Sequence, residues 1–201
     1  MAAMETRRPR LLLHACCGPC LIEPADAFAG EHDVTVAYAN PNIQPLAEYA
    51  RRFDTLRAYA VARGLPVVEL RSEPHAWARA VGPVAHDRPA RCRACYAVRL
   101  GRVAEHAAVN GFDAVATTLT VSPYQDHDAL RETAEEACAR AGVAYLDRDF
   151  RPRFADAQRR ARELGMYRQN HCGCLLSAVE ADRERAERRE ARKKAREAAT
   201  S

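Results

Sequence analysis

The chain has 201 residues, of which 48% are hydrophobic and 29% are charged, and its formal net charge is +4. This composition is ordinary for a soluble globular protein, and the small positive charge permits an anionic partner without requiring one. The apolar runs are too short to cross a bilayer, and no apolar segment precedes the first predicted strand. We therefore expect a cytoplasmic protein without a signal peptide or a membrane anchor.

Five short apolar or β-branched segments predict strands, each bounded by turn-forming residues. These strands are 11–13, 34–39, 65–70, 112–117 and 144–146. Segments with helical periodicity lie between and after them, namely 22–28, 47–63, 75–81, 92–109, 129–140, 159–164 and 180–197. Strands that alternate with helices predict βαβ units, so we expect an α/β fold with a parallel sheet of about five strands flanked by helices.

The last predicted helix is rich in Arg and Glu and has almost no apolar stripe. One interpretation is a solvated, ion-paired tail, and the other is a basic arm that contacts nucleic acid. We divide the chain accordingly into a single α/β catalytic domain, 1–178, and a charged helical tail, 179–201.

Eight cysteines need an explanation other than disulfides, because the cytoplasm keeps thiols reduced. Seven of them are clustered, at Cys16, Cys17, Cys20, Cys92, Cys95, Cys172 and Cys174. The eighth, Cys138, lies in a helical pattern, where core packing explains it. The clustering indicates metal binding or redox chemistry.

The first cluster follows the strand 11–13 directly, and the reactive crevice of open α/β sheets lies beyond the carboxyl ends of the strands. Cys92 and Cys95 are expected to open a helix, whose N-terminus would stabilise their thiolates. Together with Cys16 and Cys17 they make a four-sulfur set. Soft thiolates select zinc or an iron–sulfur cluster.

Two alternatives remain open. A structural zinc could brace a module that binds nucleic acid, although the adjacent Cys16 and Cys17 are unlike a zinc knuckle and zinc would leave Cys20 unused. The motif Cys17-Gly-Pro-Cys20 after a strand is also typical of thiol–disulfide oxidoreductases. Neither a phosphate-binding G-x-x-x-x-G-K-[ST] loop nor a G-x-G-x-x-G turn is present, so nothing supports ATP or NAD chemistry.

Polar residues gather in the predicted loops at strand ends. They are Asn40, Asn42, Thr117, Thr118, Ser122, Tyr124, Gln125 and His127. Taken singly, each is a turn or capping residue, but as a group they predict the lining of a substrate pocket.

Several motifs occur together and in order between residues 11 and 177. They are His14-Ala-Cys16-Cys17-Gly-Pro-Cys20, Asn40-Pro-Asn-Ile43, Arg91-Cys92-Arg-Ala-Cys95-Tyr96, Ser122-Pro-Tyr-Gln125 and Cys172-Gly-Cys174. In this combination the chain resembles QueH, the cobalamin-independent epoxyqueuosine reductase family. The charged tail lies outside the resemblance.

The resemblance implies reductive deoxygenation of epoxyqueuosine to queuosine at the wobble position of tRNA. It implies a Rossmann-like sheet of the adenine-nucleotide α-hydrolase type and a [4Fe–4S] cluster with a second metal ion beside it. Carried over by position, Cys16, Cys17, Cys92 and Cys95 are the cluster ligands. Cys20 stands where the family places a ligand of the second metal, which we expect to be iron, with zinc as the alternative.

The expected chemistry needs electrons from a cluster and a metal ion that acts as a Lewis acid on the epoxide oxygen. The predicted catalytic residues are Cys20 together with Tyr124 and His127, which are candidate acids beside Asp126. Cys172 and Cys174 form a possible redox pair. The expected partners are tRNA carrying epoxyqueuosine and an electron donor whose identity the sequence does not give.

Overall fold

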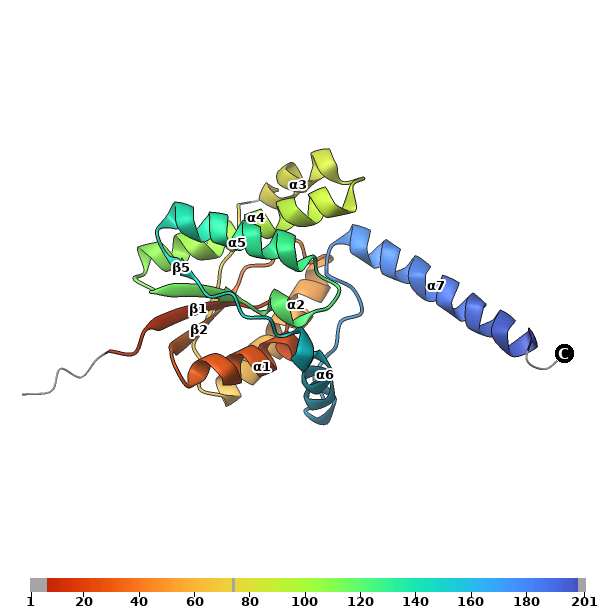
Figure 1. Ribbon diagram of the computed structural model, residues 1–201, viewed down its shortest axis with the longest axis horizontal. Coiled ribbons are helices and arrows are strands. Elements are labelled where there is room, and N and C mark those ends of the chain that lie inside the picture. Colours follow the sequence, from red (N-terminus) through yellow and green to blue (C-terminus); the bar gives the residue numbers. More distant parts are fainter. Residues whose placement is uncertain (1–6, 74, 199–201) are drawn as a thin grey trace, which may run out of the picture.

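The computed structural model describes residues 7–73 and 75–198, so residues 1–6 and 199–201, the outer ends of the two predicted units, lie outside the described residues. Its centre is a five-stranded parallel sheet in the order β3-β2-β1-β4-β5 (Figure 1). The strands are β1 (Arg10–His14), β2 (Asp33–Tyr38), β3 (Val67–Glu69), β4 (Ala114–Thr117) and β5 (Ala144–Tyr145). The predicted α/β class with a Rossmann-like parallel sheet is confirmed.

Strand β1 occupies the middle of the sheet because its side chains are apolar on both faces. Leu11, Leu12 and Leu13 are fully buried, and the strand pairs with β2 on one side and β4 on the other. A continuous apolar run is what a central parallel strand needs, since helices cover both faces of such a sheet.

Helices cover the two faces of the sheet in two groups (Figure 1). They are α1 (Gly18–Ala29), α2 (Leu46–Ala62), α3 (Ala76–Val81), α4 (Arg88–Val109), α5 (His127–Ala141), α6 (Phe154–Glu163) and α7 (Leu175–Ala198). Short 3-10 helices are η1 (Gly82–Val84), η2 (Thr118–Val121) and η3 (Arg151–Arg153). Helices α4 and α5 pack together with α3 against α4, whereas α1 packs against α2 and α6. None of the described helices is long and apolar enough to cross a membrane.

Helices α1, α4, α6 and α7 begin four or five residues earlier than their sequence predicts. Helix α1 begins at Gly18 and α4 at Arg88, each with a proline in its first turn, and the Asp87 side chain caps α4 by accepting a 3.2 Å hydrogen bond from the Ala90 N–H. Proline is well tolerated in a first turn because that N–H has no helical partner. Cys20 therefore lies in the first turn of α1, and Cys92 lies one turn inside α4.

The order of the strands reverses direction between β1 and β4. From β1 the chain builds outward through β2 to β3, and it then returns to β4 on the opposite side of β1. Ligand sites of open α/β sheets lie at this switch point, beyond the carboxyl ends of the strands. The two strand ends are joined there by a 2.8 Å hydrogen bond between His14 Nδ1 and Thr117 Oγ1, both buried.

Candidate metal centre and adjoining pocket

Three buried thiols converge directly after β1. The sulfur atoms of Cys16, Cys17 and Cys20 all lie within 4.8 Å of one another, and those of Cys16 and Cys17 are 3.8 Å apart. Gln169, from the segment before α7, donates a 2.9 Å hydrogen bond from Nε2 to the Cys17 sulfur. The convergence follows from the local fold, because β1 ends at residue 14 and α1 begins at residue 18, so all three cysteines lie in the short turn or in the first turn of α1. This trio is the group of potential metal ligands that the described residues bring together.

The three thiols are not equivalent in acidity. Hydrogen bonds from Cys17 and Cys20 lower the pKa of Cys16 well below the ordinary value of a thiol, whereas the pKa values of Cys17 and Cys20 are raised by their bonds to Cys16. A disulfide exchange enzyme needs an accessible thiolate. Cys17 and Cys20 are 1% and 5% exposed, so disulfide substrates have little access to the Cys17-Gly-Pro-Cys20 motif.

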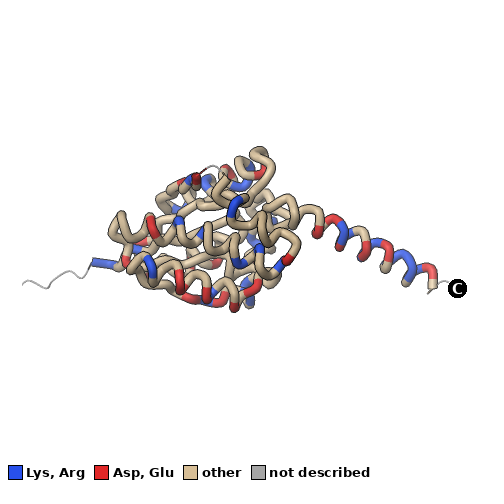
Figure 2. Tube along the Cα trace, turned by 90° about the horizontal axis from the view of Figure 1, so that it is seen from above, with Lys and Arg blue, Asp and Glu red and all other residues tan. Residues whose placement is uncertain are grey.

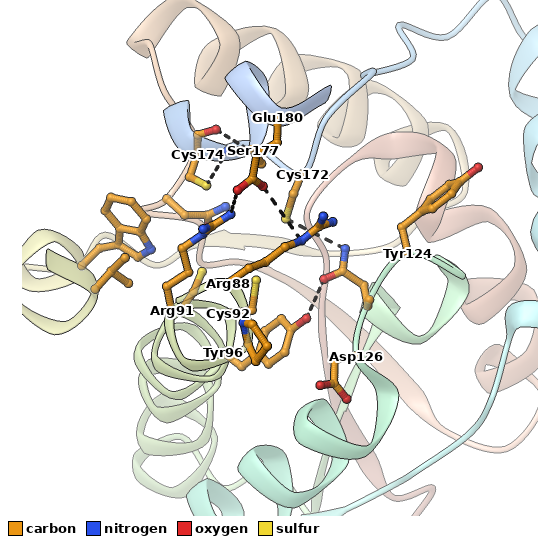
Figure 3. A pocket seen from close by; sticks show the side chains of 16 residues that line it. Arg88, Arg91, Cys92, Tyr96, Tyr124, Asp126, Cys172, Cys174, Ser177 and Glu180 are labelled. Atoms are coloured by element: carbon orange, nitrogen blue, oxygen red, sulfur yellow. Dashed lines mark hydrogen bonds and ion pairs between the residues drawn. The ribbon is translucent and has the colours of Figure 1, made fainter. Parts of the chain in front are cut away.

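Four further cysteines line a pocket (Figure 3), and one of them, Cys172, lies close enough to the trio to interact electrostatically with Cys16. Cys92 and Cys95 come from α4, and Cys172 and Cys174 come from the turn that precedes α7. Burial raises the pKa of Cys92 and Cys95, and it raises that of Cys172 to about 12. The expectation that a helix N-terminus stabilises the thiolates of Cys92 and Cys95 is therefore wrong, because α4 begins four residues before Cys92.

A buried arginine lies between the two groups of sulfurs. The Arg99 side chain is among the most deeply buried in the protein, at 1% exposed, and its Nη2 donates a 2.7 Å hydrogen bond to Oδ1 of Asn40. Burial opposes its charge, but Coulombic attraction to the ionised forms of Cys95, Cys16 and Cys172 outweighs burial and raises the pKa of Arg99. Its Nε and Nη1 atoms have no hydrogen-bond partner among the described residues. Arg99 is thus a fixed positive charge shared by both thiol groups.

Hydrogen bonds hold the turn that carries Cys172 and Cys174 against α2. Arg52, which is 1% exposed, donates hydrogen bonds to the backbone oxygens of Cys172 at 3.0 Å and His171 at 3.3 Å. Glu48 holds the Arg52 side chain in an ion pair of 2.7 Å. Gly173 has a φ of +135°, and a Cβ there would lie 2.9 Å from Ile43 Cγ1. Glycine is needed at this position because no side chain fits it.

The pocket has mixed walls and a volume of about 180 Å³. A cavity that holds a single water needs only ~10–15 Å³, so this pocket has room for a small organic group. Trp77, Val81, Pro89 and Tyr96 supply apolar surface, and the Tyr96 hydroxyl donates a 2.8 Å hydrogen bond to Gln125. The Trp77 indole N–H faces the Cys95 sulfur, whereas the Oδ1 atom of Asn42 is buried without a hydrogen-bond partner among the described residues. The Asn42 oxygen is available to a bound molecule.

One rim of the pocket is charged (Figure 3). Arg91, which is 6% exposed, pairs with Glu180 of α7, and Arg88 lies 3.9 Å from the same carboxylate. The sulfur of Cys174 accepts a 3.3 Å hydrogen bond from the backbone N–H of Ser177, so this cysteine caps α7. The first turn of α7 is therefore a part of the pocket wall.

Of the eight predicted strand-end residues, three line the pocket, namely Asn42, Tyr124 and Gln125. Tyr124, which is 73% exposed, and Asp126 line the pocket, whereas the His127 ring makes a 2.9 Å hydrogen bond with the Ser122 backbone oxygen and is not in the lining. The catalytic roles of Cys20, Tyr124 and His127 stay predictions.

Sequence reasoning missed Gln169, Arg52 and Trp77. Gln169 and Arg52 reach the cysteine turns from segments distant in the sequence, and Trp77 belongs to a short helix with no motif around it. The one available signal was that Trp77 is the only tryptophan of the chain.

The fold and the site together define a class of protein. It is a Rossmann-like α/β protein with a cysteine-rich site at the switch point of its sheet, suited to soft metals and redox chemistry.

Comparison with known proteins identifies the family. The family model described as Epoxyqueuosine reductase QueH matches residues 11–180. The Epoxyqueuosine reductase QueH of Dehalococcoides mccartyi is 33% identical over 174 residues, which cover 86% of this chain and 94% of that protein. The Epoxyqueuosine reductase QueH of Thermotoga maritima is 30% identical over 184 residues, which cover 88% of this chain and 94% of that protein. The chain belongs to the epoxyqueuosine reductase QueH family and is an oxidoreductase, as its motifs indicate.

Proposed function

We propose that this protein reduces epoxyqueuosine to queuosine at the wobble position of tRNA in the cytoplasm. The reaction removes the epoxide oxygen as water, takes up two electrons and two protons, and leaves a cyclopentene. The match to the family over residues 11–180 carries the proposal, and the buried thiols beside a pocket at the switch point support it. The electrons come from an external donor.

The residues present fit a thiolate-bound inorganic group. The trio offers soft donors that are already close together, and Arg99 supplies a buried positive charge with two unpartnered nitrogen atoms beside them. An uncompensated buried charge is costly. Anionic thiolates at this place would therefore stabilise the fold by compensating the buried charge of Arg99. We assign Cys16, Cys17, Cys92 and Cys95 to a [4Fe–4S] cluster and Cys20 to a second metal ion, iron or zinc.

When bound, the cluster supplies single electrons and the second metal supplies Lewis acidity. The chain's own residues position the substrate. Wobble bases belong to a single-stranded loop, where proteins read bases by stacking and by hydrogen bonds to their edges. Tyr96 and Trp77 offer the stacking surface, and Asn42 Oδ1 offers an acceptor.

Protons come from the exposed side of the pocket. Tyr124 and Asp126 line it, and His127 is one residue further along the same segment. Cys172 and Cys174 line the wall shared with Cys92 and Cys95, and this position supports a role for them as a redox pair or as ligands. Because burial raises the pKa of Cys172, the thiol form dominates at neutral pH until a metal or an oxidant removes its proton.

Anaerobic single-turnover reduction of tRNA carrying epoxyqueuosine tests the proposal, with a chemical reductant in place of the natural donor. Nucleoside analysis of the digested tRNA is expected to show queuosine in amounts that approach the enzyme concentration. A protein with stoichiometric zinc and no turnover would support a zinc-braced tRNA-binding module instead. A colourless protein whose Cys17 and Cys20 exchange with small disulfides would support the thiol–disulfide oxidoreductase.

A further inference from the structure

Helix α7 leaves the wall of the pocket and extends away from the α/β body, as two perpendicular views show (Figures 1 and 2). Its first turns contact the body through Glu180, Glu184 and Arg185, and none of its described residues is buried. The helix continues to Ala198. At 1.5 Å per residue, Arg192 lies about 18 Å along the helix from Glu180 at the pocket rim.

The far half of α7 is predominantly basic. Residues 188–198 include six basic and two acidic side chains, and they hold the only two lysines of the chain. Four basic residues line one shallow groove together with Glu197, namely Arg189, Arg192, Lys193 and Arg196. With about 100° between successive residues, these four fall within roughly 100° of the helix circumference. We call them the basic face of α7.

Ion pairs along the helix neutralise the other sides but leave part of this face charged. Arg183 pairs with Glu187 at 2.9 Å, Arg188 with Glu184 at 2.9 Å, and Lys194 with Glu190 at 3.2 Å. For Arg189 and Arg192 the described part of the chain contains no carboxylate partner. Arg189 makes only a 3.4 Å hydrogen bond to the Arg185 backbone oxygen. Two guanidinium groups on one exposed face are therefore available to an external anion.

We propose that the basic face of α7 binds phosphates of the tRNA while the wobble base occupies the pocket. The proposal rests on the proposed function, because a tRNA substrate is what brings a polyanion to this pocket. Guanidinium groups match phosphate geometry, and a helix fixed at the pocket rim holds them at a constant distance from the base. The match to the family model ends at residue 180, so the basic face lies outside the matched residues.

The double variant Arg189→Gln/Arg192→Gln tests the proposal against Arg183→Gln/Lys194→Gln, using the full metal-loaded chain. Both variants remove two positive charges from the same helix, but Arg183 and Lys194 lie on the opposite side and are already paired. Circular dichroism of both variants checks that the helix persists. Binding of tRNA carrying epoxyqueuosine is measured from about 50 to 300 mM salt.

The Arg189/Arg192 variant is expected to lower the slope of log K against log salt by about 1–2 and to weaken binding by about 5- to 20-fold near 150 mM salt. The Arg183/Lys194 variant is expected to match the unmodified chain. Equal loss in both variants, or loss in neither, would overturn the inference, as would binding of α7 to anionic lipid vesicles without an effect on tRNA.

Turnover distinguishes this inference from the proposed function. If the unmodified chain produces queuosine but both variants bind tRNA equally well, only the role of the basic face fails. If the unmodified chain neither binds tRNA nor reduces epoxyqueuosine in it, the proposed function fails and the inference fails with it.

Discussion

Arg99 of α4 and Asn40 at the end of β2 are joined by a 2.7 Å hydrogen bond from Nη2 to Oδ1 in the buried floor of the site. Asn40 in turn donates a 2.9 Å hydrogen bond from Nδ2 to the backbone oxygen of Ala15, the residue before the thiol trio. The helix that carries Cys95 and the turn that carries Cys16 are thereby locked to the same asparagine. Two segments distant in the sequence are held in one geometry by this chain of contacts.

We expect Arg99→Gln to make the inorganic centre harder to reduce. At an effective dielectric of about 20, a unit charge several Å away is worth about 2–4 kcal/mol, so the loss of Arg99 shifts the midpoint potential down by on the order of 100 mV. Arg99→Lys keeps the charge and is the matched control, with a much smaller shift. Anaerobic redox titration followed by electron paramagnetic resonance measures both. Equal potentials in the Gln and Lys variants would exclude an electrostatic role for Arg99.

Gly173→Ala is expected to destabilise the turn between Cys172 and Cys174. The new Cβ would lie 2.9 Å from Ile43 and 3.1 Å from Asn42, at a φ that L-residues avoid, so the cost is about 1–3 kcal/mol in the free energy of unfolding. Gly30→Ala is the control, because its φ is −69° and nothing lies within 4 Å of a Cβ there. Urea unfolding of the reduced, metal-free chains compares them. Equal losses at the two glycines would contradict the account of this turn.

Glu48 is expected to make the stability of the Cys172–Cys174 turn depend on pH. Burial opposes ionisation of Glu48, but hydrogen bonds from Arg52 and Tyr167 outweigh it, so the folded-state pKa lies below the ordinary value. Its contribution is therefore fully present above the unfolded-state pKa of about 4.3, and it is lost as the pH falls from there through the folded-state pKa.

The variant Glu48→Gln isolates this effect. Hydrogen bonds to a charged group are worth about 1.5–3 kcal/mol, so we expect the variant to be less stable by roughly that amount between pH 5 and 7. The difference from the unmodified chain should then shrink below about pH 4.3. Urea unfolding at several pH values measures it, and a difference that stays constant down to pH 3 would show that the Glu48 charge does not matter.

The core of the sheet was predictable because its determinants are local. The apolar run 11–13 has a proline before it and a glycine–proline pair after it, which is typical of a short buried strand. Because the reactive crevice of such sheets lies beyond the carboxyl ends of the strands, the first cysteines were expected at that edge of the sheet. The starts of α1 and α4 were predicted four residues late. Proline is also typical of turns, so the prolines in the first turns of these helices were assigned to the preceding loops.

The contacts that complete the site depend on tertiary structure. Arg52 is 120 residues away from Cys172, and Gln169 is 152 residues away from Cys17, so no periodicity or spacing connects them. Similarly, the motif around Cys92 predicts a helix start and acidic thiols, whereas packing against neighbouring segments buries Cys92 and Cys95 and raises their pKa values. Local patterns position the sulfurs along the chain, but only the packed structure sets their acidity and their neighbours.

The most direct test of the central claim is the iron and acid-labile sulfide content of the anaerobically purified protein, compared with its Cys92→Ala and Cys138→Ala variants. If the turns after β1 and in α4 share one [4Fe–4S] cluster, the unmodified chain and the buried, isolated Cys138→Ala variant should hold about four labile sulfides per chain. Cys92→Ala should lose most of them. Unchanged iron and sulfide in Cys92→Ala would contradict the shared cluster.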